Sequence, residues 1–311
     1  MIKCKRVLIG PSSFGDIDSA PLDLLEESDF SIIENPFKRK LTRDELLGLL
    51  PGVDGLIAGL EALDMDVLSC CDLKVISRCG SGMSNVDLDA AKECGIQVFN
   101  TPFGPTQAVA ELTIGCLLSL IRNVPQMNGD LHRGKWKKQF GRQLHGMTVL
   151  IIGYGRIGER VGTILETLGV KVVFCDPAFR GESDCNRVAN ICEILPASDV
   201  VTLHCSGDKQ ILGKKEFKLM KDGVFILNAA RGGLIDEKAL KNALDSGKIA
   251  GAWLDTFGTE PYDGPLIKYE QVILTPHIGS YTYEGRLQME IESVKNLLRG
   301  FGEVEEIGKG H

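Results

Sequence analysis

The stretch VLIIGYGRIGER, residues 149–160, decides how the rest of the chain is interpreted. Its apolar start is followed by glycines at positions 153, 155 and 158, a pattern typical of a strand that turns sharply into a helix. Glycine marks any turn that needs a positive φ or a close approach of the backbone, so the pattern alone does not identify a ligand. The flanking sequence has to decide between a binding turn and a structural one.

The segments that follow the turn complete a strand–helix–strand unit. The glycines open a helical pattern, RIGERVGTILETLG (156–169), and the next strand pattern, VKVVFC (170–175), ends directly before Asp176. In such a unit the glycines admit a pyrophosphate to the amino end of the helix, while the acid accepts hydrogen bonds from the adenosine ribose. The sequence therefore predicts a dinucleotide site. The charge of Asp176 favours NAD over NADP, whose 2′-phosphate it would repel.

Length and composition bound the class of protein. A chain of 311 residues is long for one hydrophobic core, so we expect two domains. The net charge of -7 argues against a broad surface for nucleic acid or anionic membrane, and the expected partners are small molecules. No stretch approaches the ~20 apolar residues of a membrane-spanning helix, and MIKCKRVLIG (1–10) lacks the apolar core of a signal peptide, so we expect a cytoplasmic protein. The cysteines form no C-x-x-C pair, so we expect buried thiols and no metal site.

Short apolar runs alternate with helical patterns in both halves of the chain, which predicts two doubly wound parallel α/β sheets of the Rossmann or flavodoxin kind. The expected strands of the first half are RVLIG (6–10), FSIIE (30–34), GLIAG (55–59), LKVIS (73–77) and IQVFN (96–100). Those of the second half are TVLIIG (148–153), VKVVFC (170–175), DVVTLHC (199–205), GVFILNA (223–229), AGAWLD (250–255) and QVILT (271–275).

Two long helices are expected outside this alternation. After the linker pattern NTPFGP (100–105), residues 106–124 form one apolar helix that lies between domains or at an interface. A closing helix over 282–299 has an apolar face that must be buried against another element, made by Leu287, Ile291, Val294 and Leu298.

Reduction of a ketone by a nicotinamide needs three further groups: a proton donor, a cation for an attached carboxylate, and a group that orients the donor. Three loops after expected strands offer one candidate each. Arg231 lies in NAARGGLID (228–236), Glu260 in LDTFGTEP (254–261) and His277 in ILTPHIGS (273–280). Loops at the carboxyl ends of parallel strands are where α/β sheets bind ligands, so we expect these side chains at one site.

These motifs, in this order, resemble those of the D-2-hydroxyacid dehydrogenases, in particular the phosphoglycerate dehydrogenase branch, from about Gly55 to Asn296. The resemblance implies that His277 is the acid/base catalyst, Glu260 its hydrogen-bonded partner, and Arg231 the binder of the substrate carboxylate. It implies reversible hydride transfer between NAD(H) and a small 2-hydroxy or 2-oxo acid. It also implies a homodimer, with an interface made by 106–124 and GKWKKQF (134–140).

The resemblance also implies which parts of the chain bind the substrate and which bind the cofactor. The closing helix returns to the first domain, which gives a substrate domain of 1–100 with 283–311, an NAD-binding domain of 101–282, and an active site in the cleft between them. The loop SRCGSGMSNVDLDAA (77–91) presents backbone N–H groups to the substrate carboxylate. The residues expected at the substrate are Arg78, Ser81, Gly82, Arg231 and His277. Those expected at the cofactor are Gly153, Gly155, Arg156, Ile157, Gly158, Asp176, His204, Ala229, Ala230, Arg231, Asp255, His277 and Gly279.

Some positions depart from the family pattern. Gly59 stands where phosphoglycerate dehydrogenases commonly carry an arginine for the substrate phosphate, so we expect 3-phosphoglycerate to be a poor substrate. The alternative is that Arg39, Arg43 or a residue of a second subunit supplies the missing charge. Tyr281 and Met83 are candidates to shape the far end of the pocket.

Two other functions stay open from the sequence. One is a non-catalytic protein that senses NAD on the same scaffold. The presence of Arg231, Glu260 and His277 together favours an enzyme over this alternative. The other is an NADP-linked glyoxylate or hydroxypyruvate reductase, which Asp176 disfavours and Arg180 partly supports.

Overall fold

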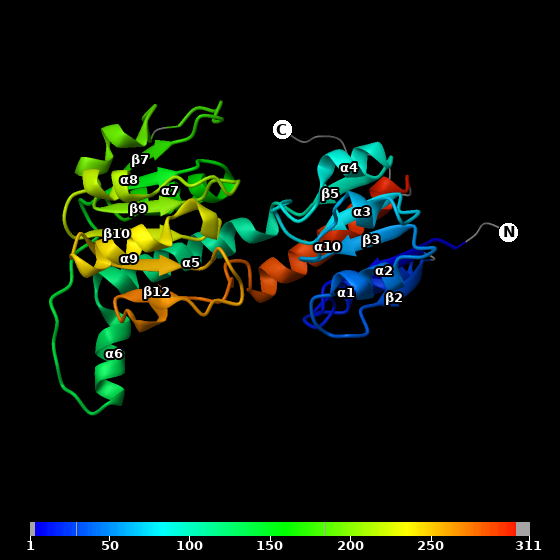
Figure 1. Ribbon diagram of the computed structural model, residues 1–311, viewed down its shortest axis with the longest axis horizontal. Coiled ribbons are helices and arrows are strands. Elements are labelled where there is room, and N and C mark those ends of the chain that lie inside the picture. The colour runs from blue at the N-terminus through cyan, green and yellow to red at the C-terminus, as the bar shows by residue number, and fades with distance from the viewer. Residues whose placement is uncertain (1–3, 29, 184, 303–311) are drawn as a thin grey trace. The chain divides into compact units, whose positions relative to one another are not determined.

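The chain folds into two compact units. The computed structural model describes residues 4–28, 30–183 and 185–302, and the units comprise Met1–Pro105 with Ser280–His311, and Thr106–Gly279 (Figure 1). The sequence placed these boundaries after residues 100 and 282, and part of its last range, 303–311, lies outside the described residues. The roles that the sequence assigned to the two units stay predictions.

The first unit is built on a five-stranded sheet in the order β2-β1-β3-β4-β5, with every neighbouring pair parallel. Its strands are β1 (Arg6–Ile9), β2 (Ser31–Glu34), β3 (Gly55–Ala58), β4 (Val75–Arg78) and β5 (Gln97–Asn100). Its helices are α1 (Ala20–Glu26), α2 (Arg43–Leu49), α3 (Met65–Leu68), α4 (Leu88–Glu93) and α10 (Tyr283–Gly300). All five strands expected in this half are present.

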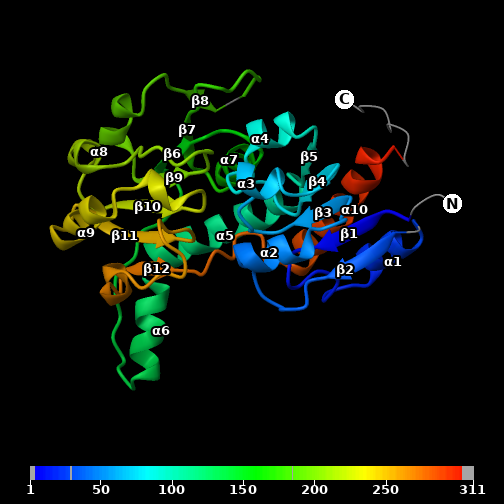
Figure 2. The same cartoon turned by 45° about the vertical axis from the view of Figure 1, so that its right-hand side comes forward.

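Two hydrophobic layers cover the faces of this sheet. Leu46 of α2, Val67 of α3 and Ala90 of α4 pack in one cluster with Leu8, Leu56 and Ile76 of the strands. On the other face, α1 and α10 pack against Val7, Ile9, Ile57 and Val75. Figure 2 shows the sheet between these helices. Alternate residues of each strand therefore point into opposite layers, as a doubly wound sheet requires.

The closing helix begins one residue later than expected, because the Thr282 side chain accepts a hydrogen bond from the Gly285 N–H and caps it. Its buried face also differs from the expected one. Val294 and Leu298 are buried as expected, but Met289 and Leu297 complete the face. Leu287 and Ile291 are only half-buried, because the helix is rotated so that a row of smaller and polar residues also lies inward.

The second unit is built on a seven-stranded parallel sheet in the order β12-β11-β10-β9-β6-β7-β8. Its strands are β6 (Thr148–Ile152), β7 (Lys171–Cys175), β8 (Asn186–Arg187), β9 (Val200–Leu203), β10 (Val224–Asn228), β11 (Ile249–Leu254) and β12 (Val272–Leu274). Its helices are α5 (Gly104–Ile121), which begins in the linker, α6 (Val124–His132), α7 (Arg156–Thr167), α8 (Lys214–Leu219) and α9 (Glu237–Asp245), with short 3-10 turns η1 (Ile191–Glu193), η2 (Leu195–Ala197), η3 (Gly232–Leu234) and η4 (Pro265–Lys268).

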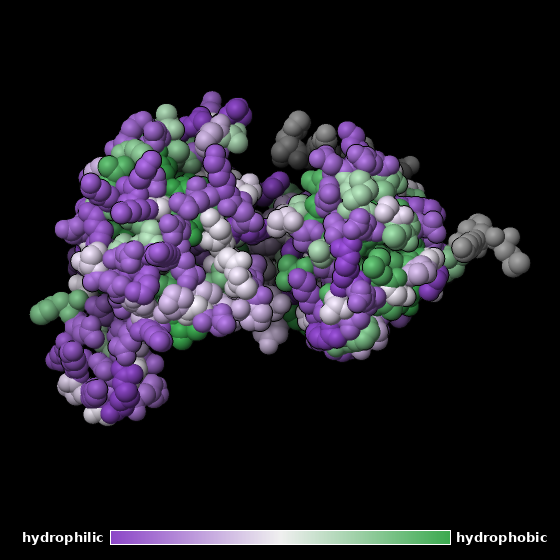
Figure 3. Space-filling view, viewed as in Figure 1, coloured by the Kyte–Doolittle hydropathy of each residue, from purple (hydrophilic) through white to green (hydrophobic). Residues whose placement is uncertain are grey.

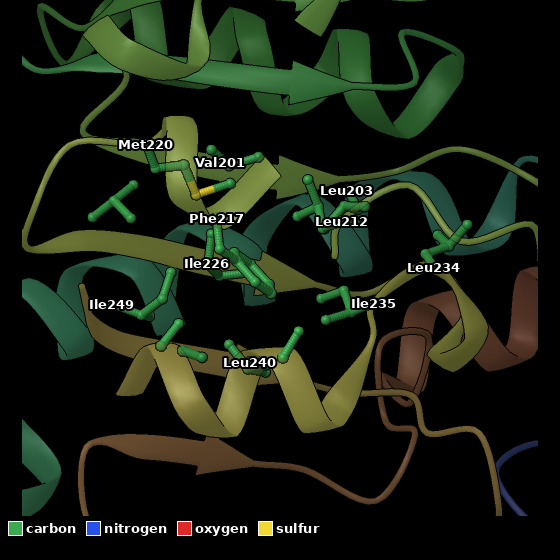
Figure 4. Close-up of a cluster of buried hydrophobic side chains, with 14 of the residues drawn as sticks. Val201, Leu203, Leu212, Phe217, Met220, Ile226, Leu234, Ile235, Leu240 and Ile249 are labelled. Carbon is green, nitrogen blue, oxygen red and sulfur yellow. The ribbon is translucent and has the colours of Figure 1, made fainter. Parts of the chain in front are cut away.

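Helices again cover both faces of the sheet. Figure 4 shows one layer, in which Phe217 of α8 and Leu240 of α9 pack on Val201, Ile226 and Ile249 of the strands. In the opposite layer α5 and α7 pack on β6, β7, β10 and β11. The central strands β6, β9 and β10 are buried on both faces, which explains their nearly continuous apolar sequences.

The expected helix over 106–124 corresponds to α5, which ends three residues earlier than expected, and the helix α6 that follows it was not predicted. The α5 helix ends at Ile121, and Asn123 adopts a left-handed conformation (φ 52°) before α6 begins with Pro125 in its first turn. The chain changes direction there because asparagine tolerates this conformation and proline favours a new helix start. In Figures 1 and 2, α6 projects from the rest of its unit, and its surface in Figure 3 is largely hydrophilic.

Among the described residues, α5 alone is long and apolar enough to span a membrane by length and composition, with a mean hydropathy of 1.3. The sequence had suggested that no stretch came near this limit. However, 61% of the helix is buried, and Ala110, Leu117 and Ile121 belong to the hydrophobic layer on the seven-stranded sheet. Packing against the sheet accounts for its apolar composition, so it is weak evidence for a membrane span.

Candidate active site

The expected site residues follow adjacent strands of the seven-stranded sheet. His277 follows β12, Glu260 follows β11 and Arg231 follows β10. His204 follows β9, the glycine turn follows β6, and Asp176 follows β7. These loops share one edge because the strands are parallel. From β6 the chain moves first to β7 on one side and later to β9 on the other, so the glycine turn lies at the switch point where such sheets bind ligands.

Each glycine of the turn has its own structural reason. Gly153 has a φ of 89°, and a Cβ there would lie 2.4 Å from the backbone nitrogen of Cys205. A Cβ on Gly158 would lie 2.1 Å from the carbonyl oxygen of Gly153, so only glycine lets the helix pack so closely on the turn. In contrast, nothing lies within 4 Å of the Cβ position of Gly155. Open space therefore faces the middle glycine.

This open space lies at the amino end of α7. Gly155 is the cap residue of the helix, and no side chain caps it within residues 4–28, 30–183 and 185–302. The first N–H groups of a helix attract anions when no side chain occupies them. The turn thus fits the pyrophosphate of a dinucleotide.

Asp176 is held beside the glycine turn. Its Oδ2 accepts a hydrogen bond from the Tyr154 N–H (2.8 Å), and its Oδ1 accepts one from the Ala178 N–H (2.7 Å). Each carboxylate oxygen retains a lone pair for a further donor such as a ribose hydroxyl. The Arg180 guanidinium donates to the carbonyl oxygens of Pro177 and Phe179, and so lies against its own loop.

His204 lies next to the turn and is held uncharged. Its Nε2 is 2.8 Å from the Thr202 hydroxyl, and its backbone N–H donates to the Ile152 carbonyl. Burial lowers the pKa of His204 to about 4. Its buried Nδ1 has no hydrogen-bond partner in the part of the chain that the structure describes. An unsatisfied buried nitrogen at the switch point is consistent with the expected place of His204 beside the cofactor.

Arg231 is positioned by Asn228, the last residue of β10. The Asn228 side chain accepts a hydrogen bond from the Ala230 N–H (3.0 Å) and donates one to the Arg231 carbonyl (2.8 Å). The half-buried Arg231 side chain donates from Nη1 to the Ala230 carbonyl (2.7 Å). The turn also packs tightly on the glutamate loop, because a Cβ on Gly232 would lie 1.9 Å from the Phe257 carbonyl carbon.

His277 and Glu260 form a hydrogen-bonded pair. The His277 Nδ1 lies 3.0 Å from the Glu260 Oε2, while the other Glu260 oxygen accepts a hydrogen bond from the Phe257 N–H (3.1 Å). His277 has a left-handed backbone (φ 54°), a conformation that is uncommon for residues other than glycine and that clusters at functional sites. Because Glu260 occupies Nδ1, the other ring nitrogen, Nε2, is the one that can exchange a proton with a substrate. The structure therefore brings the expected acid/base pair together and places the Arg231 turn against it.

Asp255 holds the histidine loop. The side chain is 1% exposed, and it accepts hydrogen bonds from the Thr275 hydroxyl (2.6 Å) and from the N–H groups of Ile278 (2.9 Å) and Gly279 (2.8 Å). A Cβ on Gly279 would lie 3.0 Å from the carboxylate, which explains the glycine. Asp255 thus positions His277 through its loop. Its expected contact with the cofactor stays a prediction.

The expected substrate loop lies in the first unit. Gly80 has a φ of 143°, and the Arg78 guanidinium fills the space that a side chain at Gly80 would need. Arg78 donates to the Cys79 carbonyl, and Asn100 donates to the Ser81 carbonyl (2.8 Å). Within the described ranges of the chain, the N–H groups of Ser81 and Gly82 donate to no protein acceptor. Both can therefore donate to an anion, and their expected contact with the substrate carboxylate stays a prediction.

Comparison with known proteins agrees with this geometry. Residues 114–279 match the sequence model of a family described as "D-isomer specific 2-hydroxyacid dehydrogenase, NAD binding domain". The chain belongs to the D-isomer specific 2-hydroxyacid dehydrogenase family. The second unit of this family member thus carries the family's NAD-binding domain, and NAD is its cofactor.

Relatives of this 2-hydroxyacid dehydrogenase family member carry several activities. It is 36% identical over 283 residues to the D-3-phosphoglycerate dehydrogenase of Archaeoglobus fulgidus, an alignment that covers 86% of this chain and 54% of that one. The chain therefore spans about half the length of such relatives. It is also 36% identical over 274 residues to the hydroxypyruvate reductase of Thermotoga maritima, which covers 84% of this chain and 89% of that one. Among solved structures, a glyoxylate reductase from Paecilomyes thermophila has a TM-score of 0.86 at 31% identity and covers 95% of both chains.

The sequence did not single out the positioning residues of this family member. Asn228 and Thr275 lie next to site loops and bind backbone or side-chain groups there. A polar residue at the buried end of each apolar strand pattern was the available signal, since such residues need partners. The sequence does not show what these residues bind, however. Asn228 binds backbone groups of its own turn, and Thr275 binds Asp255 of another loop.

Proposed function

We propose that this protein is an NAD-dependent oxidoreductase that interconverts a small 2-oxo acid and the corresponding 2-hydroxy acid. The observation that carries the proposal is the 3.0 Å contact between His277 Nδ1 and Glu260 Oε2, beside the Arg231 turn on an NAD-binding domain. The 2-oxo and 2-hydroxy acids are the substrates that the name of this family describes.

The protein groups have distinct tasks in the proposed reaction. NADH supplies the hydride when it is bound. Arg231 binds the carboxylate of the 2-oxo acid and polarises its carbonyl oxygen, because a guanidinium offers two parallel donors to a carboxylate. His277 donates its Nε2 proton to the carbonyl oxygen and takes the proton back in the reverse direction. Glu260 accepts the Nδ1 hydrogen bond and so fixes the orientation of the ring. In the first unit, the N–H groups of Ser81 and Gly82 are proposed to donate to an anionic group of the substrate.

The identity of the substrate is the finer part of the proposal. Hydroxypyruvate or glyoxylate is favoured over a phosphorylated acid, because Gly59 supplies no cation. The two arginines that the sequence offered as other sources of this charge are paired with carboxylates. Arg39 donates to both carboxylate oxygens of Glu45, and Arg43 is paired with Asp64 and Asp66.

We also propose a homodimer. Leu131, Trp136 and Phe140 are exposed on α6 and the chain that follows it, with 56%, 82% and 105% of their surface accessible. Large apolar side chains clustered on a projecting segment are typical of protein interfaces. The buried thiols of Cys79, Cys116 and Cys175 support a reducing compartment, and we propose the cytoplasm.

The test is turnover by the purified protein. We expect steady oxidation of NADH in the presence of glyoxylate or hydroxypyruvate, and slower oxidation with NADPH because of the charge of Asp176. A protein that binds NADH but turns over none of a broad panel of 2-oxo acids would be a sensor, and the proposal would be wrong. A clear preference for NADPH would contradict the role given to Asp176.

A further inference from the structure

A buried carboxylate lies at the carboxyl edge of the five-stranded sheet. Glu61 follows β3 by a short turn and is 2% exposed. A Cβ on Gly10, after β1, would lie 3.0 Å from its Oε1, and a Cβ on Gly59 would lie 3.1 Å from the same oxygen. The carboxylate therefore lies directly over the ends of two neighbouring strands, and glycine at both positions leaves room for it.

The backbone that carries Glu61 is bonded to the expected substrate loop, while the carboxylate itself is held by its own turn. The Gly59 N–H donates to the Glu61 Oε2 (2.7 Å). The Asn85 side chain donates to the carbonyl oxygens of Gly59 (3.2 Å) and Glu61 (2.7 Å). Asn85 follows Ser81 and Gly82 in the loop after β4, and β4 is the strand next to β3. Glu61 and the N–H groups of Ser81 and Gly82 thus follow the carboxyl ends of two neighbouring parallel strands of the first unit.

The electrostatic surroundings of Glu61 are dominated by burial. Burial raises the pKa of Glu61, and the positive charges of Lys40 and Arg78 offset this effect only in part. Arg78 is engaged by the Cys79 carbonyl and fills the space beside Gly80. A second anion beside the ionised Glu61 is screened poorly in these surroundings, so its binding costs either the repulsion or the uptake of a proton by Glu61.

We propose that Glu61 is a specificity-determining residue, which selects 2-oxo acids with an uncharged hydrogen-bond donor on the third carbon and rejects those with an anionic group there. A hydroxyl group donates to a carboxylate, whereas a phosphate has only negatively charged acceptors to offer it. The proposal rests on the proposed function. Without a cation at Gly59 the protein does not attract a phosphorylated acid, and we assign to Glu61 the further effect of repelling it.

The test compares kcat/KM for hydroxypyruvate and 3-phosphohydroxypyruvate in the wild-type protein and in Glu61→Gln. Glutamine keeps an oxygen for the Gly59 N–H but removes the charge. We expect the ratio of kcat/KM to shift toward the phosphorylated compound by about tenfold or more, mainly through a lower KM for that compound. Glu93→Gln, at an exposed position of α4, is the matched control and should leave the ratio unchanged.

The outcomes separate the two proposals. An unchanged ratio in a folded Glu61→Gln protein contradicts the role of Glu61 alone, whereas no turnover of any 2-oxo acid by the wild-type protein overturns both proposals. If Glu61→Gln does not fold, Glu61→Ala is the second variant, and the same shift of the ratio toward the phosphorylated compound is expected. An unchanged ratio in folded Glu61→Ala would overturn the role of Glu61.

Discussion

At the scale of single residues, the proposed chemistry depends on the orientation of one imidazole. Glu260 binds the Nδ1 of His277, and Asp255 holds the loop on either side of it. Two carboxylates thus act on the same histidine in different ways. Glu260 touches the ring, while the buried Asp255 fixes the backbone from which the ring projects.

Replacing Glu260 by glutamine keeps the size of the side chain but removes its charge. The His277 Nδ1 then loses the charged acceptor that orients the ring. We expect kcat/KM for 2-oxo acid reduction to fall at least about tenfold. Steady-state kinetics of the two proteins at one pH measure this. Equal values of kcat/KM would show that Glu260 does not act on His277.

His204 provides a test of stability against pH. Its pKa is about 4 in the folded protein and about 6.5 in an unfolded chain, so between these values the unfolded state binds more protons. This contribution to stability is fully present above pH 6.5 and is lost as the pH falls toward 4. The loss is on the order of 3 kcal/mol.

The measurement is chemical denaturation of wild type and His204→Gln at several pH values. The variant should lose less free energy of unfolding between pH 6.5 and 4 than the wild type, because glutamine does not titrate. His132→Gln, at an exposed position, is the control and should keep the wild-type slope. Equal slopes for wild type and His204→Gln would mean that the imidazole titrates freely in the folded protein.

At the scale of elements, the glycine turn separates packing from binding. An alanine at Gly158 would place its Cβ 2.1 Å from the Gly153 carbonyl oxygen, whereas the Cβ position of Gly155 is open. We expect Gly158→Ala to cost about 1–3 kcal/mol of folding stability. Gly155→Ala should leave stability almost unchanged but weaken NADH binding, because its methyl group would occupy the space in front of the helix.

Thermal unfolding and fluorescence titration with NADH measure the two effects. The pair of variants forms its own control, since each glycine is changed to the same residue within one turn. If Gly155→Ala bound NADH as tightly as the wild type, the pyrophosphate would not lie at this turn.

The sequence predicted the elements better than their ends and faces. The apolar strand patterns located their strands because buried parallel strands have nearly continuous apolar sequences. It missed β8, whose residues Asn186 and Arg187 are exposed and show no apolar pattern. It extended α5 three residues too far and missed α6, because the break at Asn123 depends on one backbone conformation. Likewise, the motifs located Arg231, Glu260 and His277, but the roles of Asn228 and Asp255 depend on contacts between loops.

At the scale of the whole molecule, the homodimer is the main prediction. The apolar side chains of Trp136 and Phe140 are almost fully exposed in a single chain, and a dimer would bury them. We expect sedimentation at micromolar concentration to show a dimer for the wild type. The double variant Trp136→Ser with Phe140→Ser should shift the population toward the monomer. A wild-type monomer under these conditions would reject the interface.

The central claim is that His277 transfers a proton to a 2-oxo acid on this NAD-binding scaffold. The most direct measurement is kcat for NADH-dependent reduction of hydroxypyruvate by His277→Asn, with NADH affinity titrated in the same preparation. We predict a fall in kcat of about 10²–10⁴-fold with NADH affinity little changed, because the ring acts on the substrate oxygen. A variant that binds NADH and retains wild-type turnover would contradict the account.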